Sequence, residues 1–356
     1  MDKERNADRG ISGAGREASD SVNRNLKLSW RVIPVREQDF ADITITETAV
    51  GPEPVSEQQI REWEGFSRSD KDCPSEWLVA VDLYRKDHDA FLGWGKWGKG
   101  HWLSADEREV HVAVPPSKRR MGVGTFLLEH MEAMAKRDNP KAIYAWGRGY
   151  DKTSADWALK RGYEVARERT EGLLDLEGFD ASKFQSDLDK VRGAGFDIRT
   201  VWDEGLEPHL PGLYKVSVET FHDVPFASTD PVDISYDDWI HEVKGSSARK
   251  LFAIAFHEGE IVGYSNVWMP QIEGQSAVID YTGVLRPCRG KGIAFAVKVV
   301  ATVEAAKAGV KVIRTNNDPD NPAILHLNER MGFKPVPGPI IFRKKVSSQP
   351  MGLIIS

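Results

Sequence analysis

Apolar and polar positions separate most clearly in the second half of the chain. Two apolar runs, 251–256 and 261–268, flank a short polar turn and predict an antiparallel hairpin. A third strand is expected at 277–285. The segment 295–308 then has apolar residues at helical spacing and stops before Gly309, which is typical of a helix C-terminus.

The remainder of this half continues the alternation of strand and helix. A short apolar run at 310–315 predicts a buried strand, and Asn321-Pro322 marks the start of a helix that reaches Arg330. A closing strand is expected at 340–346. The pattern therefore predicts an α/β (α+β) fold with a mixed, mostly antiparallel central sheet flanked by helices.

The first half shows the same order of elements. Strands are expected at 77–83, 91–94, 109–114 and 172–176, and a helix is expected at 125–136.

The two halves also share landmarks at a constant distance. Both contain a glycine loop of the form R-x-x-G-x-G/A, at 119–124 and at 289–294, which are offset by 170 residues. The same offset relates Gly162-Tyr163 to Gly332-Phe333, and Gly93 to Gly263. Because one constant offset aligns all of these landmarks, the two halves are interpreted as copies of a duplicated domain.

These landmarks set the expected domain boundaries. The chain is divided into a polar tail at 1–25, a first domain at 26–179, a linker helix at 180–195, a second domain at 196–348 and a short tail at 349–356.

Composition narrows the class of protein. The 356 residues include 40% hydrophobic and 29% charged residues with a net charge of −6, which does not favour nucleic acid or an anionic membrane as a partner. There is no apolar run of about 18 residues. Two cysteines exclude a disulfide framework and a cysteine zinc cage, so we expect no metal and a cytoplasmic location.

The glycine loops have the chemistry of a phosphate site. Glycines allow a tight turn that brings successive N–H groups together, and the following helix N-terminus adds positive charge, so each loop suits a pyrophosphate. A dinucleotide fold would place an acidic residue on the next strand, where 310–315 has none. Neither copy contains the P-loop pattern.

Several segments resemble a known family. Thr282–Ala294, Thr315–Asn317 and Asn321–Phe333 in the second copy, and more loosely Val112–Gly124 and Trp157–Tyr163 in the first, are similar to the GNAT superfamily of acyl-CoA-dependent N-acetyltransferases in a tandem, two-domain form.

The resemblance implies acetyl-CoA as cofactor. The positions that it assigns to cofactor binding are Thr282, Gly283, Val284, Arg289, Gly290, Lys291, Gly292, Ile293, Ala294, Asn317 and Asn321 in the second copy, and Val112, Ala113, Val114, Arg119, Arg120, Met121, Gly122, Val123 and Gly124 in the first.

The same resemblance implies roles in catalysis. The amide of Val284 polarises the thioester carbonyl as an oxyanion donor does. Asn328 stands where many members use a tyrosine as general acid, and Ala158 stands there in the first copy. Because the first copy also has Asp151 in place of Asn321, the second domain is expected to be catalytic, and the first to bind CoA without turnover.

The general base and the acceptor site are nominations from residue type and position. Asp280 lies four residues before Val284 on the same strand, hence on the same face by the period of two, although a surface or paired carboxylate is an equal alternative. Glu219, Phe221, His222 and Asp223 are nominated for acceptor binding, with an ordinary helix end as the alternative.

Two functions follow. The first is transfer of an acetyl group from acetyl-CoA directly to a primary amine of a small molecule, by a monomer or homodimer. The alternative is a non-catalytic CoA-binding or scaffold protein, in which Asn328 and Ala158 reflect lost chemistry.

Overall fold

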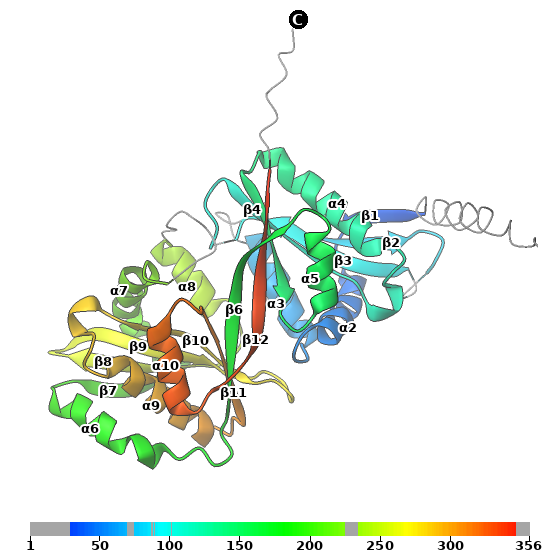
Figure 1. Cartoon of the computed structure of the whole chain (residues 1–356). Helices are drawn as coiled ribbons and strands as arrows, with labels where there is room; N and C mark the ends of the chain where they lie inside the picture. The colour runs from blue at the N-terminus through cyan, green and yellow to red at the C-terminus, as the bar shows by residue number, and fades with distance from the viewer. Residues whose placement is uncertain are drawn as a thin grey trace, which may run out of the picture.

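A computed structural model describes residues 29–69, 75–86, 88, 90–100, 102–224 and 234–346. The predicted tails at 1–25 and 349–356 lie outside these residues. The molecule has two lobes, called here the N-lobe and the C-lobe, which correspond to the two sequence copies (Figure 1).

The N-lobe follows the predicted order of elements. Its helices and strands are β1 (Trp30–Pro34), α2 (Phe40–Val50), α3 (Glu57–Ser69), β2 (Ser75–Asp82), β3 (Phe91–Gly98), β4 (Glu107–Ala113), α4 (Val123–Ala135), β5 (Ala142–Arg148), α5 (Lys152–Leu159) and β6 (Glu164–Asp175).

The C-lobe repeats this order after a connecting helix. Its elements are α6 (Gln185–Gly193), β7 (Asp197–Trp202), α7 (Leu210–Phe221), α8 (Tyr236–Lys244), β8 (Lys250–His257), β9 (Glu260–Trp268), β10 (Ala277–Val284), α9 (Ile293–Lys307), β11 (Val312–Asn317), α10 (Pro322–Met331) and β12 (Lys334–Lys345).

All twelve strands form one sheet in the order β1-β2-β3-β4-β5-β12-β6-β11-β10-β9-β8-β7. Among the described strands, only the β4–β5 and β10–β11 pairs are parallel. The predicted mixed α/β fold with a mostly antiparallel sheet is therefore confirmed.

The two lobes exchange their closing strands. β6 ends the first copy but pairs with β11 of the C-lobe, and β12 ends the second copy but pairs with β5 of the N-lobe. β6 and β12 also pair with each other, side by side between the lobes (Figure 1). The sequence pattern did not predict this exchange.

The hydrophobic cores show the exchange as well. Leu174 and Leu176 of the first copy lie in the C-lobe core, and Phe342 of the second copy lies in the N-lobe core. The closing strand of the first copy was predicted only at 172–176, because its earlier part is rich in arginine and glutamate. These charged side chains find partners on β11 and the loop after it, so this part of β6 also joins the sheet.

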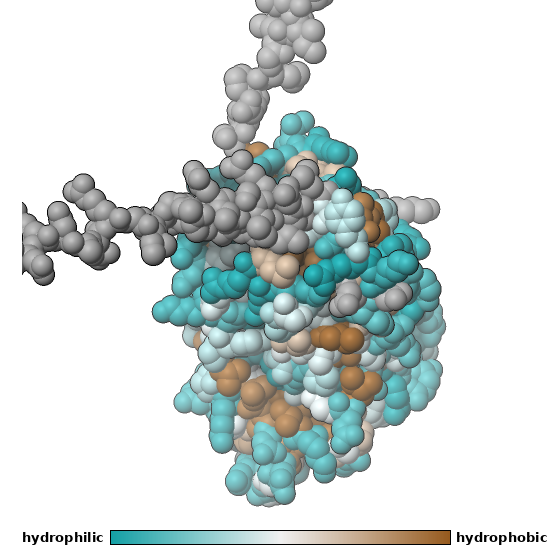
Figure 2. Space-filling view, turned by 90° about the vertical axis from the view of Figure 1, so that its right-hand side faces the viewer, coloured by the Kyte–Doolittle hydropathy of each residue, from teal (hydrophilic) through white to brown (hydrophobic). Residues whose placement is uncertain are grey.

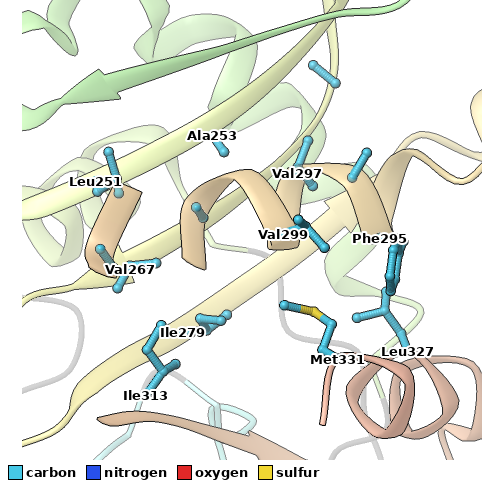
Figure 3. Close-up of a cluster of buried hydrophobic side chains, with 14 of the residues drawn as sticks. Leu251, Ala253, Val267, Ile279, Phe295, Val297, Val299, Ile313, Leu327 and Met331 are labelled. Atoms are coloured by element: carbon cyan, nitrogen blue, oxygen red, sulfur yellow. The ribbon is translucent and has the colours of Figure 1, made fainter. Parts of the chain in front are cut away.

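The C-lobe core forms where α9 crosses the sheet. Figure 3 shows Val297 and Val299 on α9, which passes across the strands that carry Ala253 and Val267, with Met331 of α10 beside them. The apolar residues at helical spacing in 295–308 predicted this helix, although it begins two residues earlier, at Ile293.

The face of the molecule shown in Figure 2 is mostly polar. Figure 2 shows one face on which hydrophobic residues form separate patches among hydrophilic ones. No helix within the described ranges combines the length and the apolar character needed to cross a bilayer.

The strand exchange predicts that a core residue of the first copy stabilises the C-lobe. Leu174→Ala removes a side chain that is 4% exposed in the C-lobe core and is expected to lower the free energy of unfolding by about 2–5 kcal/mol. Hydrogen exchange should then accelerate in β10 and β11 rather than in β4 and β5.

Val165→Ala on the same strand is the matched control, since Val165 is 43% exposed. Its effect should stay within about 0.5 kcal/mol. Equal losses from the two variants, or faster exchange confined to the N-lobe, would contradict the assignment of Leu174 to the C-lobe core.

Candidate functional site

Each glycine loop leads into a helix through left-handed backbone. Gly122 precedes α4 with φ 96°, and Gly292 precedes α9 with φ 82°. Two residues before them, Arg120 and Gly290 also have positive φ, of 65° and 76°. The first N–H groups of a helix have no acceptor within it, so the start of each of these helices offers backbone amides as hydrogen-bond donors.

An arginine holds each loop to the end of the preceding strand. Arg289 Nε donates to the Val284 carbonyl at 2.9 Å, and Arg119 Nε donates to the Val114 carbonyl at 3.2 Å. The same bond in both copies places the loop next to the strand end from which the resemblance expects a carbonyl-polarising amide.

Asp223 completes the loop in the C-lobe. Its carboxylate accepts from Arg286 and from Arg289, each at 2.5 Å. The hydrogen bonds from these two arginines lower the pKa of Asp223 to about 2. Asp223, nominated for acceptor binding, is thus paired with Arg286 before the glycine loop and with Arg289 within it.

Strands β10 and β11 diverge beside this loop. They pair only from Ala277 to Ile279, after which β10 continues against β9 and β11 continues against β6. β4 and β5 separate in the same way after Val110. The two strands therefore splay apart next to Thr315–Asn317, which leaves a slot in the sheet.

The slot opens into a cavity of about 350 Å³, called here the C-lobe cavity. Residues from α7, α8, β8–β11 and the start of α10 line it. The lining includes Thr282, Asn317 and Asn321 among the predicted cofactor residues, and Asp280 and Phe221 among the nominated ones. Glu219, His222 and Asp223 are not among the lining residues.

Two carboxylates face this cavity. Asp280 accepts a hydrogen bond from Asn266 Nδ2 at 3.2 Å, and Glu242 of α8 also lines the cavity. The surrounding protein atoms raise the pKa of Asp280. The same crowding, together with the negative charge of Asp280, raises the pKa of Glu242 to about 7. Both side chains remain accessible to water in the cavity.

The expected relation of Asp280 to Val284 is wrong. A β-bulge between Ile279 and Tyr281 shifts the register, so Val284 packs in the core under α9 while Tyr281 packs against α7 and α8. Asp280 is consequently on the side of α8 and Glu242 rather than on the side of Val284. A bulge of this kind re-aims a side chain without a signal in the alternation of residues.

A buried lysine lies at the opposite wall. Lys298 of α9 is 1% exposed, and its Nζ donates to Oδ1 of Asn328, which is also buried. Burial lowers the pKa of Lys298 to about 7. Asn328 Nδ2 has no hydrogen-bond partner among the described residues.

The exchanged strand contributes Arg169 to the C-lobe cavity. Arg169 lies on β6 of the first copy, and its Nε has no hydrogen-bond partner among the described residues. Burial lowers the pKa of this guanidinium, while Asp318 of the C-lobe opposes the shift. The C-lobe cavity is thus built by both copies.

The sequence of each copy matches one family model. The model of the acetyltransferase (GNAT) family matches residues 41–163 and 211–333, which together span more than half of the chain and repeat at the offset of 170 residues. The chain belongs to the acetyltransferase (GNAT) family. It is an acyltransferase enzyme with two tandem GNAT domains.

Three individual proteins are similar to this chain over most of its length. The mycothiol acetyltransferase of Geodermatophilus obscurus is 26% identical over 249 residues, which cover 68% of this chain and 75% of that protein. A tandem GNAT protein from the clavulanic acid biosynthesis pathway superposes with a TM-score of 0.71 at 17% identity, over 90% of this chain and all of that one. A GCN5-related N-acetyltransferase from Sphaerobacter thermophilus superposes with a TM-score of 0.60 at 19% sequence identity, over 89% of this chain and 96% of that one.

The N-lobe of this acetyltransferase departs from the C-lobe at equivalent positions. Asp151 caps α5 by accepting from the Ser154 N–H at 3.0 Å, as Asn321 caps α10 through the Ile324 N–H at 3.3 Å. Trp157 packs 3.4 Å from the place where Gly124 would carry a Cβ. The acetyltransferase therefore keeps the fold of the loop in both lobes but has different side chains around it.

Three residues that line the C-lobe cavity were not identified from the sequence. Lys298 had a signal, because it is the single charge in the apolar stretch 293–303. Glu242 and Arg169 had none, since the cavity brings together a short helix and a strand of the other copy. No group of three or more His, Cys, Asp or Glu suited to a metal occurs in the part of the chain that the structure describes.

The depressed pKa of Asp223 predicts a pH-dependent contribution to stability. Its ion pairs stabilise the folded state above the ordinary value of 3.8, and this contribution is lost as pH falls through about 2. Asp223→Asn should therefore destabilise the enzyme at pH 7, by less than about 1 kcal/mol because the groups are partly exposed, and by progressively less below pH 4. Urea unfolding between pH 3 and 7 measures the difference.

The control replaces both partners. In an Arg286→Gln/Arg289→Gln background, Asp223→Asn should have an effect that no longer depends on pH. A pH-independent effect in the native background would show that the two arginines do not hold this carboxylate in solution.

Proposed function

We propose that the C-lobe transfers an acetyl group from acetyl-CoA to a primary amine of a small molecule. The observation that carries this proposal is the C-lobe cavity, in which a carboxylate pair and a buried lysine line one space that opens from the slot beside a glycine loop.

The residues of the slot suit acetyl-CoA. The amides of Gly290–Ile293 would hold the pyrophosphate, and Asn317 and Asn321 line the path that the pantetheine arm would take. Bound acetyl-CoA supplies the thioester whose acetyl group is transferred. The Val284 amide belongs to the strand end next to the splay, in keeping with an oxyanion donor.

The carboxylate pair is proposed as the general base. An amine enters as an ammonium ion and must lose a proton before it can attack. Glu242 and Asp280 share a crowded space, so one carboxyl retains a proton near neutral pH while the other accepts one. The nomination of Asp280 is thereby extended to a pair with Glu242.

Lys298 is proposed to supply a proton to the leaving group. Asn328 occupies the position of the family's tyrosine and cannot act as an acid, but it accepts a hydrogen bond from the Lys298 ammonium. With a pKa of about 7, this ammonium can release its proton near neutral pH. The absence of a tyrosine is then no argument for lost chemistry.

The loops predict a selective effect of charge on CoA binding. Gly290→Asp adds a carboxylate at an open position with positive φ, and it should weaken acetyl-CoA binding to the C-lobe at least 10-fold in calorimetric titration. Gly290→Asn is the matched control, because asparagine has nearly the same shape and tolerates this backbone without the charge.

The equivalent pair, Arg120→Asp and Arg120→Asn, tests the N-lobe loop. Two sites in the native enzyme, of which one is lost in each aspartate variant, would support CoA binding by both lobes. If acetyl-CoA does not bind to the native enzyme, the proposal is wrong.

The titrating groups predict a bell-shaped pH profile for kcat. The rate should rise with pH as the carboxylate pair loses a proton and fall as Lys298 loses its own, with both limbs near pH 7. Glu242→Gln and Asp280→Asn should lower the rate about 100-fold and alter the acidic limb. Lys298→Met should remove the alkaline limb.

Release of free CoA thiol with a panel of small amines measures these rates. Lys311→Met, at an exposed position before β11, is the control for loss of a lysine. CoA binding without thiol release for any amine would instead favour the non-catalytic CoA-binding or scaffold alternative.

A further inference from the structure

A second cavity, of about 420 Å³, lies between the lobes and is called here the aromatic cavity. Its walls contain five large aromatic side chains, namely Trp63, Phe66, Trp77, Trp94 and Trp268. Trp77 and Trp94 stack with ring centroids 4.4 Å apart. Phe66 stacks on His241 at the same distance, which holds it in place.

The aromatic cavity is the N-lobe counterpart of the C-lobe cavity. At the offset of 170 residues, Trp94 and His111 stand where the C-lobe has Tyr264 and Tyr281. In the C-lobe, these two hydroxyls bond to Ser217 and Thr220 of α7. The N-lobe has the indole ring of Trp94 and the imidazole ring of His111 at these positions. The wall of the aromatic cavity therefore lacks the two hydroxyls that line the C-lobe cavity.

Carboxylates accompany the aromatic walls. Glu47, Glu62 and Glu242 all line the aromatic cavity. The opposing cation is Lys96, whose ammonium is 2.8 Å from the carboxylate of Glu109 and is thereby balanced. The three lining carboxyl groups thus outnumber the single lysine ammonium of the lining.

Glu47 is held in an ionised form. It is 7% exposed, accepts from Trp94 Nε1 at 3.1 Å and lies 3.3 Å from His111 Nε2. Burial raises the pKa of this carboxyl, but His111 and the more distant Arg148 outweigh burial and lower it. This buried carboxylate, which accepts from Trp94 and lies next to His111, therefore lines the cavity beside the stacked indoles.

The wall of the aromatic cavity contains one buried hydrogen-bond donor without an acceptor among the described residues. The indole N–H of Trp77, a residue that is only 6% exposed, has no hydrogen-bond partner among the described residues. Buried polar groups without partners are uncommon in folded proteins and are costly. A ligand oxygen is one way in which this group would be satisfied.

We propose that the aromatic cavity binds an organic ammonium compound. Aromatic faces attract cations through the ring quadrupole, and the lining carboxylates, of which Glu47 is buried, add Coulomb attraction that a neutral ligand does not receive. The exposed edge is formed by Trp63, which is 43% exposed, so a ligand can enter there. Trp268, whose ring contacts the Lys250 ammonium at 5.0 Å, closes the side toward the C-lobe cavity.

The site extends beyond the proposed acetyl transfer and does not depend on it. Glu242 and Trp268 nevertheless line both cavities, so an ammonium ion in the aromatic cavity would lie beside a carboxylate of the proposed base. A cation there favours the ionised form of Glu242. A ligand in the aromatic cavity would therefore change the charge of Glu242, which also lines the C-lobe cavity.

The test is calorimetric titration of the full-length protein, without acetyl-CoA, with choline and with its neutral isostere 3,3-dimethylbutan-1-ol. Choline should bind and the alcohol should bind at least 10-fold more weakly. Trp63→Leu and Glu47→Gln should each weaken choline binding by about 2- to 30-fold. Trp146→Leu removes a tryptophan of similar exposure, at 40%, outside the cavity, and should change nothing.

Three other outcomes of these titrations would each contradict the proposal. Equal affinity for choline and the alcohol would show an apolar cavity without cation selectivity. Choline binding that survives Trp63→Leu and Glu47→Gln but is lost in Asp280→Asn would assign the cation to the C-lobe cavity. No binding of choline would leave the cavity without the proposed ligand class. None of these results bears on thiol release from acetyl-CoA, so the two proposals fail separately.

Discussion

The backbone hydrogen bonds of the two closing strands are the constraint on which the rest of the structure depends. β6 has β11 on one side and β12 on the other, and β12 has β6 and β5. Neither strand can satisfy its buried N–H and C=O groups within its own copy, since each pairs across the lobe boundary. The two copies therefore share one continuous sheet and cannot form their native sheets independently.

This shared sheet also fixes the polar contacts between the lobes. Arg167 of β6 pairs with Asp318 and Asp320, and Arg314 of β11 pairs with Glu171 of β6 and with Glu53 of the N-lobe. Half-buried ion pairs that connect the two lobes restrict the orientation of one lobe relative to the other. The same geometry brings Arg169 into the C-lobe cavity, so the C-lobe cavity is incomplete without the first copy.

Duplication has preserved one part of each lobe and changed another. The loop, its left-handed residues and the arginine bond to the strand end occur in both copies, because they depend on backbone geometry. The two cavities differ because they depend on side chains. One cleft contains tyrosine hydroxyls and a crowded carboxylate pair, while the other contains stacked tryptophans.

The sequence by itself determined the duplication, the order of strands and helices, the fold class and the position of both glycine loops. These features follow from local signals: the period of apolar residues, glycine at positive φ and a fixed offset. Only the tertiary structure decided the strand exchange. The alternation of apolar and polar residues along a strand shows which of its faces is buried, but it does not show which copy supplies the neighbouring strands. It also decided the bulge that separates Asp280 from Val284 and the meeting of Glu242, Asp280 and Lys298, because long-range packing sets which distant residues share a cavity.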